Sequence, residues 1–198
     1  MARRRLLGNL VAGLVFAVPA TAGESPAVDH GRECTPSPEV TELASETPAH
    51  AVDGCGVPVW ILSVAAMAHA WAHLSWSMAD PDRDPLLARI GAAMQEHPWH
   101  VSGDERIDLR LARAAAERYV GKIGAKGVFC IALPDREISI ALKVESGDDA
   151  AVAVAARHVI DVVAPGALHP DPDFPWHHVK NVVGDTVGAR HVLSLIHI

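Results

Sequence analysis

Two apolar runs in the middle of the chain constrain the fold most, because together they predict a β-hairpin. The runs are GVFCIAL (127–133) and SIALKVE (139–145), and the turn-forming segment PDRE (134–137) joins them. Side chains alternate across a strand, so the even residues 138–144, which are all apolar, share one face. The odd residues 139–145 are small or charged. We therefore expect a hairpin with one buried face and one wetter face.

Two helices are predicted before this hairpin. Apolar residues recur at helical spacing from Val57 to Asp80, which indicates one long and largely buried helix that ends at Asp80-Pro81. A second helix is expected over 84–96, where Asp84 can cap the N-terminus and Pro85 suits the first helical position.

A third helix and a last helix complete the pattern. Ser102 and Glu105 have the spacing of a capping box, which predicts a helix that runs through residue 120 and ends at Gly121. After the hairpin, the segment Ser146-Gly147-Asp148 is expected to cap a helix over 149–163. The order helix, helix, helix, hairpin, helix predicts an α+β fold with helices packed on an antiparallel sheet.

Composition argues against two classes of protein. The chain carries 17 basic and 24 acidic residues, a net charge of −7, and no basic run outside residues 3–5, so nucleic-acid binding is not expected. The cysteines are Cys34, Cys55 and Cys130; an odd number leaves at least one thiol unpaired, which argues against a disulfide scaffold.

The ends of the chain are set apart from the predicted domain, residues 51–192. Residues 1–22 combine a basic start, an apolar stretch and an Ala-x-Ala site, and indicate either a signal peptide or a misplaced start. The apolar stretch is too short for a comfortable membrane span. Residues 23–50 are expected to be a disordered linker, and LSLIHI (193–198) resembles the peptide encoded by a sequencing adapter.

The segment VGKIGAKGVFC (120–130) raises the question of a phosphate-binding loop. A Walker loop requires Ser or Thr after its lysine, whereas Ile123 follows Lys122. A dinucleotide loop follows a strand and opens a helix, and the order expected here is the reverse. The pattern therefore favours a lysine held between glycines at the edge of a sheet.

Cys55 lies between Gly54 and Gly56, and two interpretations remain open. One is a tight turn with an incidental small residue, which the local pattern favours. The other is a thiolate ligand or nucleophile, because a helix N-terminus lowers the pKa of a thiol.

Other candidate ligands are weaker. His69 and His73 are spaced i, i+4 and could ligate a metal, but Ala70 stands where a zincin has Glu and no third ligand is evident. Buried or rim histidines are the favoured interpretation, His177-His178 is expected at the surface, and Cys130 is expected to be a small core residue.

Several linked motifs resemble the asparaginase II-like family, a group of serine-β-lactamase/glutaminase-like amidohydrolases. The motifs are DGCGVP (53–58), VSGxxRxDxxL (101–111), GKIGAKGVFCIALPDREISIALKVESGD (121–148) and VKNVVGDTVG (179–188). The resemblance implies that residues 51–192 are the C-terminal half of such a domain.

The resemblance also implies a function. Members of this family are L-asparaginases, which hydrolyse asparagine to aspartate and ammonia with serine–lysine dyads near a zinc ion. Lys122 matches the lysine that acts as general base for the second serine. Cys55 matches a zinc-ligating cysteine. Asp53 matches an acidic residue beside that site, which is expected to contact the zinc ligands rather than the ion.

The sequence departs from the family pattern in ways that bear on activity. The upstream serine–lysine element, the second serine and a Cys-Ser-Gly-Lys-His metal element are not recognised, so the chain alone is expected to be inactive. Lys126 replaces the usual Glu, and Ser146-Gly147 replaces Asp-Gly. The alternatives are the C-terminal half of a hydrolase, a non-catalytic exported remnant or binding module, and assembly with a separate N-terminal half.

The expected partner is a small molecule, asparagine, with no nucleic acid and no membrane span, and a homodimer of the family type is compatible with the resemblance. The resemblance implies a cytoplasmic protein, whereas a true signal peptide over residues 1–22 would imply export.

Overall fold

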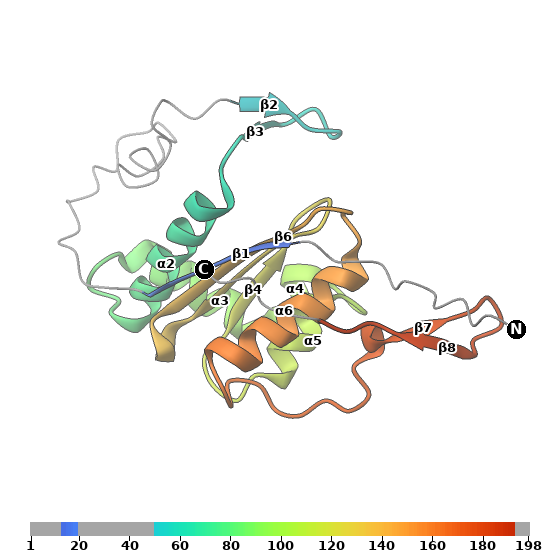
Figure 1. Cartoon of the computed structure of the whole chain (residues 1–198). Coiled ribbons are helices and arrows are strands. Elements are labelled where there is room, and N and C mark those ends of the chain that lie inside the picture. Colours follow the sequence, from blue (N-terminus) through green and yellow to red (C-terminus); the bar gives the residue numbers. More distant parts are fainter. Residues whose placement is uncertain (1–12, 20–49, 193–198) are drawn as a thin grey trace, which may run out of the picture.

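A computed structural model describes the backbone of residues 13–19, and the backbone and side chains of residues 50–192 (Figure 1). The elements, in chain order, are β1 (Gly13–Pro19), β2 (His50–Val52), β3 (Pro58–Trp60), α2 (Val64–Ala79), α3 (Pro85–Glu96), α4 (Pro98–Ser102), α5 (Ile107–Ala114), β4 (Val120–Ile123), β5 (Val128–Leu133), β6 (Ile138–Val144), α6 (Asp149–Val163), β7 (His178–Lys180) and β8 (Thr186–Ala189).

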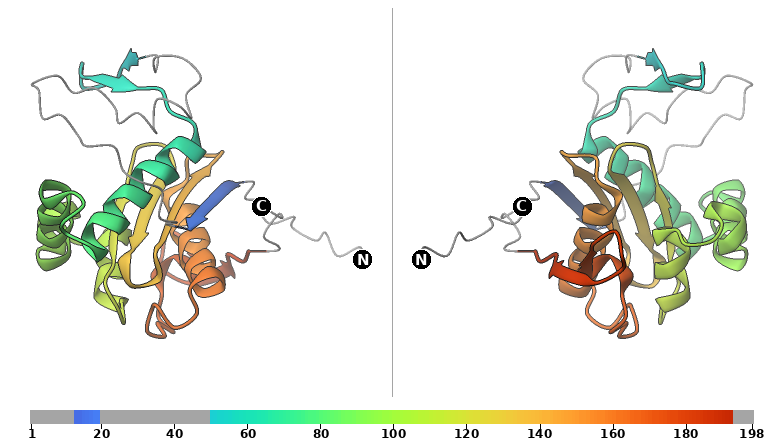
Figure 2. Two further views of the ribbon diagram at one scale, coloured as in Figure 1. Left: turned by 90° about the vertical axis from the view of Figure 1, so that its left-hand side faces the viewer. Right: turned by 90° about the vertical axis from the view of Figure 1, so that its right-hand side faces the viewer.

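Four antiparallel strands form the central sheet in the order β1-β6-β5-β4. The predicted hairpin is its centre, with Ile131 of β5 opposite Ile140 of β6. Helix α2 covers one face of the sheet and α6 covers the other (Figure 2). The predicted α+β class, with helices packed on an antiparallel sheet, is confirmed.

The main core lies between the sheet and α6. Buried aliphatic residues of β5 and β6 meet Val152, Val159 and Ile160 of α6 in one cluster, and Leu111 brings α5 into it. The even residues Ile140, Leu142 and Val144 are at most 1% exposed, as their alternation predicts. Removing this area from water is the main stabilising contribution in a domain of this kind.

The prediction of a wetter second face of the hairpin is only partly confirmed, because Lys143 is half-buried and Glu145 is exposed but the other two residues of that face are dry. Ser139 and Ala141 point toward α2 and are 0% exposed, and the hydroxyl of Ser139 donates a hydrogen bond of 2.7 Å to the carbonyl oxygen of Ala68. Small side chains on the strand and Ala68 on the helix allow α2 to approach the sheet closely. Small residues on a strand therefore marked a helix contact rather than a solvated face.

Helix α2 is shorter than predicted. It begins at Val64, because the Ser63 hydroxyl accepts a hydrogen bond from the Ala66 amide at 3.1 Å, and it ends at the predicted Asp80. Residues 58–60 pair with 50–52 as a small hairpin instead of continuing the helix. The predicted α3 is confirmed, with the Asp84 carboxylate accepting from the amides of Leu86 and Leu87.

The predicted capping box at Ser102 and Glu105 is also wrong. Ser102 is the last residue of α4, and Glu105 has a positive φ of 58° outside any helix. Helix α5 spans only Ile107–Ala114 and has no side-chain cap at its start. Helix α6 is confirmed over 149–163, with Asp148 as its N-cap.

Gly121 lies in strand β4 rather than after a helix. A Cβ atom added there would collide with the Tyr119 ring, 2.7 Å from Cζ, so the residue is small because a phenol packs against it. The predicted helix C-cap is replaced by a strand because residues 120–123 pair with 129–132 across a short turn.

The terminal predictions are only partly covered by the described residues. Residues 13–19, within the predicted signal-like segment 1–22, form β1 beside β6, and the remainder of that segment lies outside the described residues. So do 23–49 of the predicted linker and the adapter-like 193–198. Among the helices that the structure describes, none has the length and apolar character needed to cross a membrane.

Candidate functional site

The segment VGKIGAKGVFC is a β-hairpin that joins β4 to β5. The amide of Gly124 donates to the carbonyl oxygen of Val128 at 2.8 Å, and the turn places Lys126 and Gly127 at φ angles of 57° and 80°. The expected order, in which a helix leads directly into the loop, is wrong, because β4 stands before the turn. A β-hairpin still lacks the helix N-terminus on which a phosphate-binding loop depends.

Lys122 lies in β4, the edge strand of the sheet, opposite Cys130 of β5. Its Nζ is 2.8 Å from the carbonyl oxygen of Ile123 and 3.4 Å from Oδ2 of Asp108 on α5. The Lys122 side chain is 41% exposed, whereas that of Asp108 is 2% exposed. The expected lysine at a sheet edge is therefore present, and its amine reaches a buried carboxylate.

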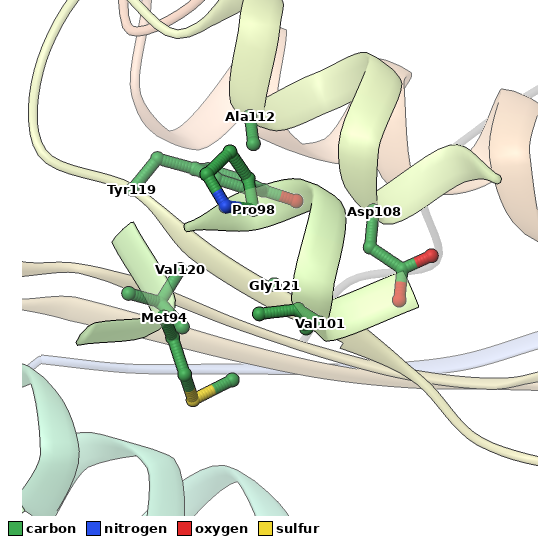
Figure 3. Close-up of a pocket in the computed structure, with 8 residues that line it drawn as sticks. All are labelled: Met94, Pro98, Val101, Asp108, Ala112, Tyr119, Val120 and Gly121. Carbon is green, nitrogen blue, oxygen red and sulfur yellow. The ribbon is translucent and has the colours of Figure 1, made fainter. Parts of the chain in front are cut away.

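A small pocket lies beside this pair, between α4, α5 and β4 (Figure 3). It has room for about one water molecule. Within the described part of the chain, Asp108 Oδ1 and the Tyr119 hydroxyl are buried without a hydrogen-bond partner. Burial, and then the negative charge of Asp108, raise the pKa of Tyr119 well above its usual value. The pocket is too small for an amino-acid substrate, and its lining residues are Met94, Pro98, Val101, Asp108, Ala112, Tyr119, Val120 and Gly121.

Cys55 occupies the turn between β2 and β3, a hairpin that projects from the body of the structure (Figures 1 and 2). Oδ1 of Asp53 accepts hydrogen bonds from the amides of Cys55 at 2.8 Å and Val57 at 3.1 Å, so this carboxylate shapes the turn. Every residue from 50 to 61 is exposed. The structure shows the turn that the local pattern favoured.

The same residues bear on the expected zinc site. Among residues 50–192, no group of three His, Cys, Asp or Glu side chains is placed to hold a metal ion. The described side chains around Cys55 thus do not fit a zinc ion by themselves, and the assigned roles of Cys55 and Asp53 stay predictions. No hydrogen bond or ion pair joins either residue to Lys122 within the described residues.

The weaker candidates lie where the favoured interpretations put them. His69 and His73 are half-buried on α2, and His73 has an edge contact with Trp76. His177 and His178 are exposed. Cys130 is 5% exposed in the core, and burial raises the pKa of its thiol to about 12.

Comparison with known families decides what these motifs belong to. The model of the L-asparaginase II family matches residues 34–192, which is most of the chain. The chain belongs to the L-asparaginase II family. The match includes Lys122, Asp108, Cys55 and Asp53, and it also covers part of the segment predicted as a linker. A comparison with curated proteins finds no match.

Sequence reasoning missed Asp108 as a residue of this site. It stands at the Asp position of the VSGxxRxDxxL motif, 14 residues before Lys122. The available signal was an acidic residue between apolar residues of an amphipathic helix, because a carboxylate on a buried face needs a partner.

Proposed function

We propose that this chain carries the general base of an L-asparaginase-type amidohydrolase, which converts asparagine to aspartate and ammonia. The observation that carries the proposal is the family match over residues 34–192, which includes the lysine matched to the base. The position of Lys122 on a sheet edge, with a partly exposed side chain, supports it.

The hydrogen bonds of Lys122 allow it to act as a base once the ammonium that pairs with Asp108 has lost a proton. A neutral amine has two N–H groups and one lone pair, and Nζ has two acceptors within 3.4 Å, Ile123 O and Asp108 Oδ2. With both N–H groups donated, the lone pair is left to accept a proton. In the proposed reaction that proton comes from a serine hydroxyl, whose oxygen attacks the side-chain amide carbon of asparagine. The lysine then passes this proton to the amide nitrogen, which leaves as ammonia while the acyl-enzyme forms, and hydrolysis of the acyl-enzyme by water releases aspartate and restores the serine hydroxyl.

The serine is the missing part of this mechanism. Among the described residues, no serine hydroxyl is hydrogen-bonded to Lys122. The proposal therefore includes a serine supplied from outside the described residues, either by this gene product or by a second polypeptide. Zinc enters no step, because the described residues do not fit it.

The test is ammonia release from asparagine and from glutamine, measured for the purified chain alone and together with the serine-bearing half of an L-asparaginase II family protein. We expect activity only with the added half. Lys122→Met should reduce it at least about 100-fold, the usual scale for loss of a general base. Lys122→Arg keeps the positive charge but cannot act as a base, so it should be equally inactive. Activity that survives Lys122→Met would contradict the proposal.

A non-catalytic binding module is the second candidate, favoured by the lack of a serine hydroxyl hydrogen-bonded to Lys122 in the described residues. It predicts that asparagine or aspartate binds the chain without turnover. Isothermal titration calorimetry separates the two candidates, because a module gives saturable binding heat and no ammonia even with the serine-bearing half present.

A further inference from the structure

Asp108 is a buried carboxylate that enters the proposed reaction only as an acceptor for the amine of Lys122. It lies in the second position of α5, and its side chain is 2% exposed. Carboxylates are rarely buried this completely unless they are paired, because removing a charge from water is costly. The groups that contact the Asp108 carboxylate therefore indicate its structural role.

Three polar contacts meet at the same place on β4. Oδ2 of Asp108 accepts from the Ile123 amide at 3.2 Å and from Lys122 Nζ at 3.4 Å, and Nζ also donates to Ile123 O at 2.8 Å. Because β4 is the edge strand among the described strands, none of them pairs with its outer backbone groups. The Asp108 carboxylate takes the place of a strand partner there and holds the lysine amine beside it.

We propose that Asp108 is a positioning residue for Lys122, which fixes the amine at the free edge of β4 from the neighbouring helix. The inference rests on the proposed role of Lys122 as base, and it assigns a role to the Asp of the VSGxxRxDxxL motif. The lysine side chain is flexible and 41% exposed. A lysine that loses little rotamer freedom on reaching its reactive position is a better-placed base.

A second ion pair on α5 provides a matched control. The Arg110 guanidinium binds Asp171 through two hydrogen bonds of 2.7 Å. Among the described residues neither of the two, unlike Asp108, forms a hydrogen bond or ion pair with β4. Loss of the Arg110–Asp171 pair weakens the attachment of α5 to the rest of the domain without removing any contact of Lys122. The control therefore separates positioning of the lysine from general support of the helix.

The experiment is acetylation of the native full chain by acetic anhydride, with the rate at each lysine followed by mass spectrometry. Asp108→Asn keeps an oxygen that can accept from the Ile123 amide, but it removes the charge that holds the amine. We expect the acetylation rate of Lys122 to rise at least three-fold in Asp108→Asn. Asp171→Asn should leave it unchanged, and the exposed Lys126 and Lys180 serve as internal references.

Equal rates at Lys122 in wild type and Asp108→Asn would overturn the proposal, and so would an equal rise in Asp171→Asn. If Asp108→Asn does not fold, the ion pair is tested by substituting the lysine instead. Lys122→Met leaves a buried carboxylate without its cation, so its urea midpoint should fall clearly below that of Lys126→Met; equal midpoints would also overturn the proposal.

The outcome is distinguishable from that of the proposed function. Acetylation and unfolding report the contact between Asp108 and Lys122 with no substrate present. A rise at Lys122 in Asp108→Asn, together with no hydrolysis under any condition, would support the positioning and refute the asparaginase reaction.

Discussion

The hydroxyl of Ser139 on β6 donates a 2.7 Å hydrogen bond to the carbonyl oxygen of Ala68 on α2, and both residues are 0% exposed. This contact fastens α2 to the centre of the sheet. The bond lies on the face of the hairpin that was expected to be wetter, and its full burial shows that water is excluded from this part of that face.

Ser139→Ala should lower the free energy of unfolding by about 1 kcal/mol, the usual net value of a buried neutral hydrogen bond. Urea unfolding followed by circular dichroism measures it. Thr186→Ala on the exposed strand β8 is the control and should change little. An Ser139→Ala protein as stable as the wild type would mean that water reaches this hydroxyl.

Gly121→Ala should destabilise the protein by about 1–3 kcal/mol, as overpacking of a core does. The added methyl group would meet Tyr119 Cζ at 2.7 Å, and the phenol is 2% exposed, so it has little room to move. Gly54→Ala is the matched control, since a Cβ there has no neighbour within 4 Å. Combining Gly121→Ala with Tyr119→Val should recover part of the loss, whereas a purely additive result would refute the steric account.

Asp171 makes stability depend on pH at the acid end. Its hydrogen bonds to Arg110 hold the pKa of this carboxyl below its usual value. A depressed pKa stabilises the folded state above the unfolded pKa, near pH 4, and that contribution is lost as the pH falls through the folded value. The urea midpoint of the wild type should therefore fall more steeply below pH 4 than that of Asp171→Asn, and parallel curves would contradict the assignment.

The thiols of Cys55 and Cys130 should differ sharply in reactivity. Cys55 is exposed in its turn, whereas burial raises the pKa of Cys130 to about 12 and so keeps it protonated at pH 8. Alkylation with iodoacetamide at pH 8, followed by peptide mapping, should modify Cys55 at least ten times faster. In 6 M urea the two rates should converge, and comparable rates in the native protein would show that the β5 core opens.

Local patterns predicted the elements whose signals lie within a few residues. The Asp84 and Asp148 caps set the starts of α3 and α6, and the alternation in 138–144 set the apolar face of β6. These features depend on residues that are close together in the sequence, so a local pattern is enough to predict them.

The failures share one physical cause, which is competition from partners elsewhere in the chain. Residues 58–60 are helix-compatible but pair with 50–52. Residues 115–120 lie outside the helix predicted for them, and residue 120 pairs with β5. Pairing and packing partners override a weak helical preference, and they are not visible in a local window.

For the site, the sequence alone determined the family motifs, the edge-type surroundings of Lys122 and the burial of Cys130. Only the tertiary structure decided that Asp108 meets Lys122, that Tyr119 packs on Gly121, and that Cys55 stands in an exposed turn apart from both. The reason is that a contact between a helix and an edge strand depends on how the whole sheet is covered. Burial then selects which charges must meet, because a carboxylate taken from water has to find its partner in space rather than in sequence.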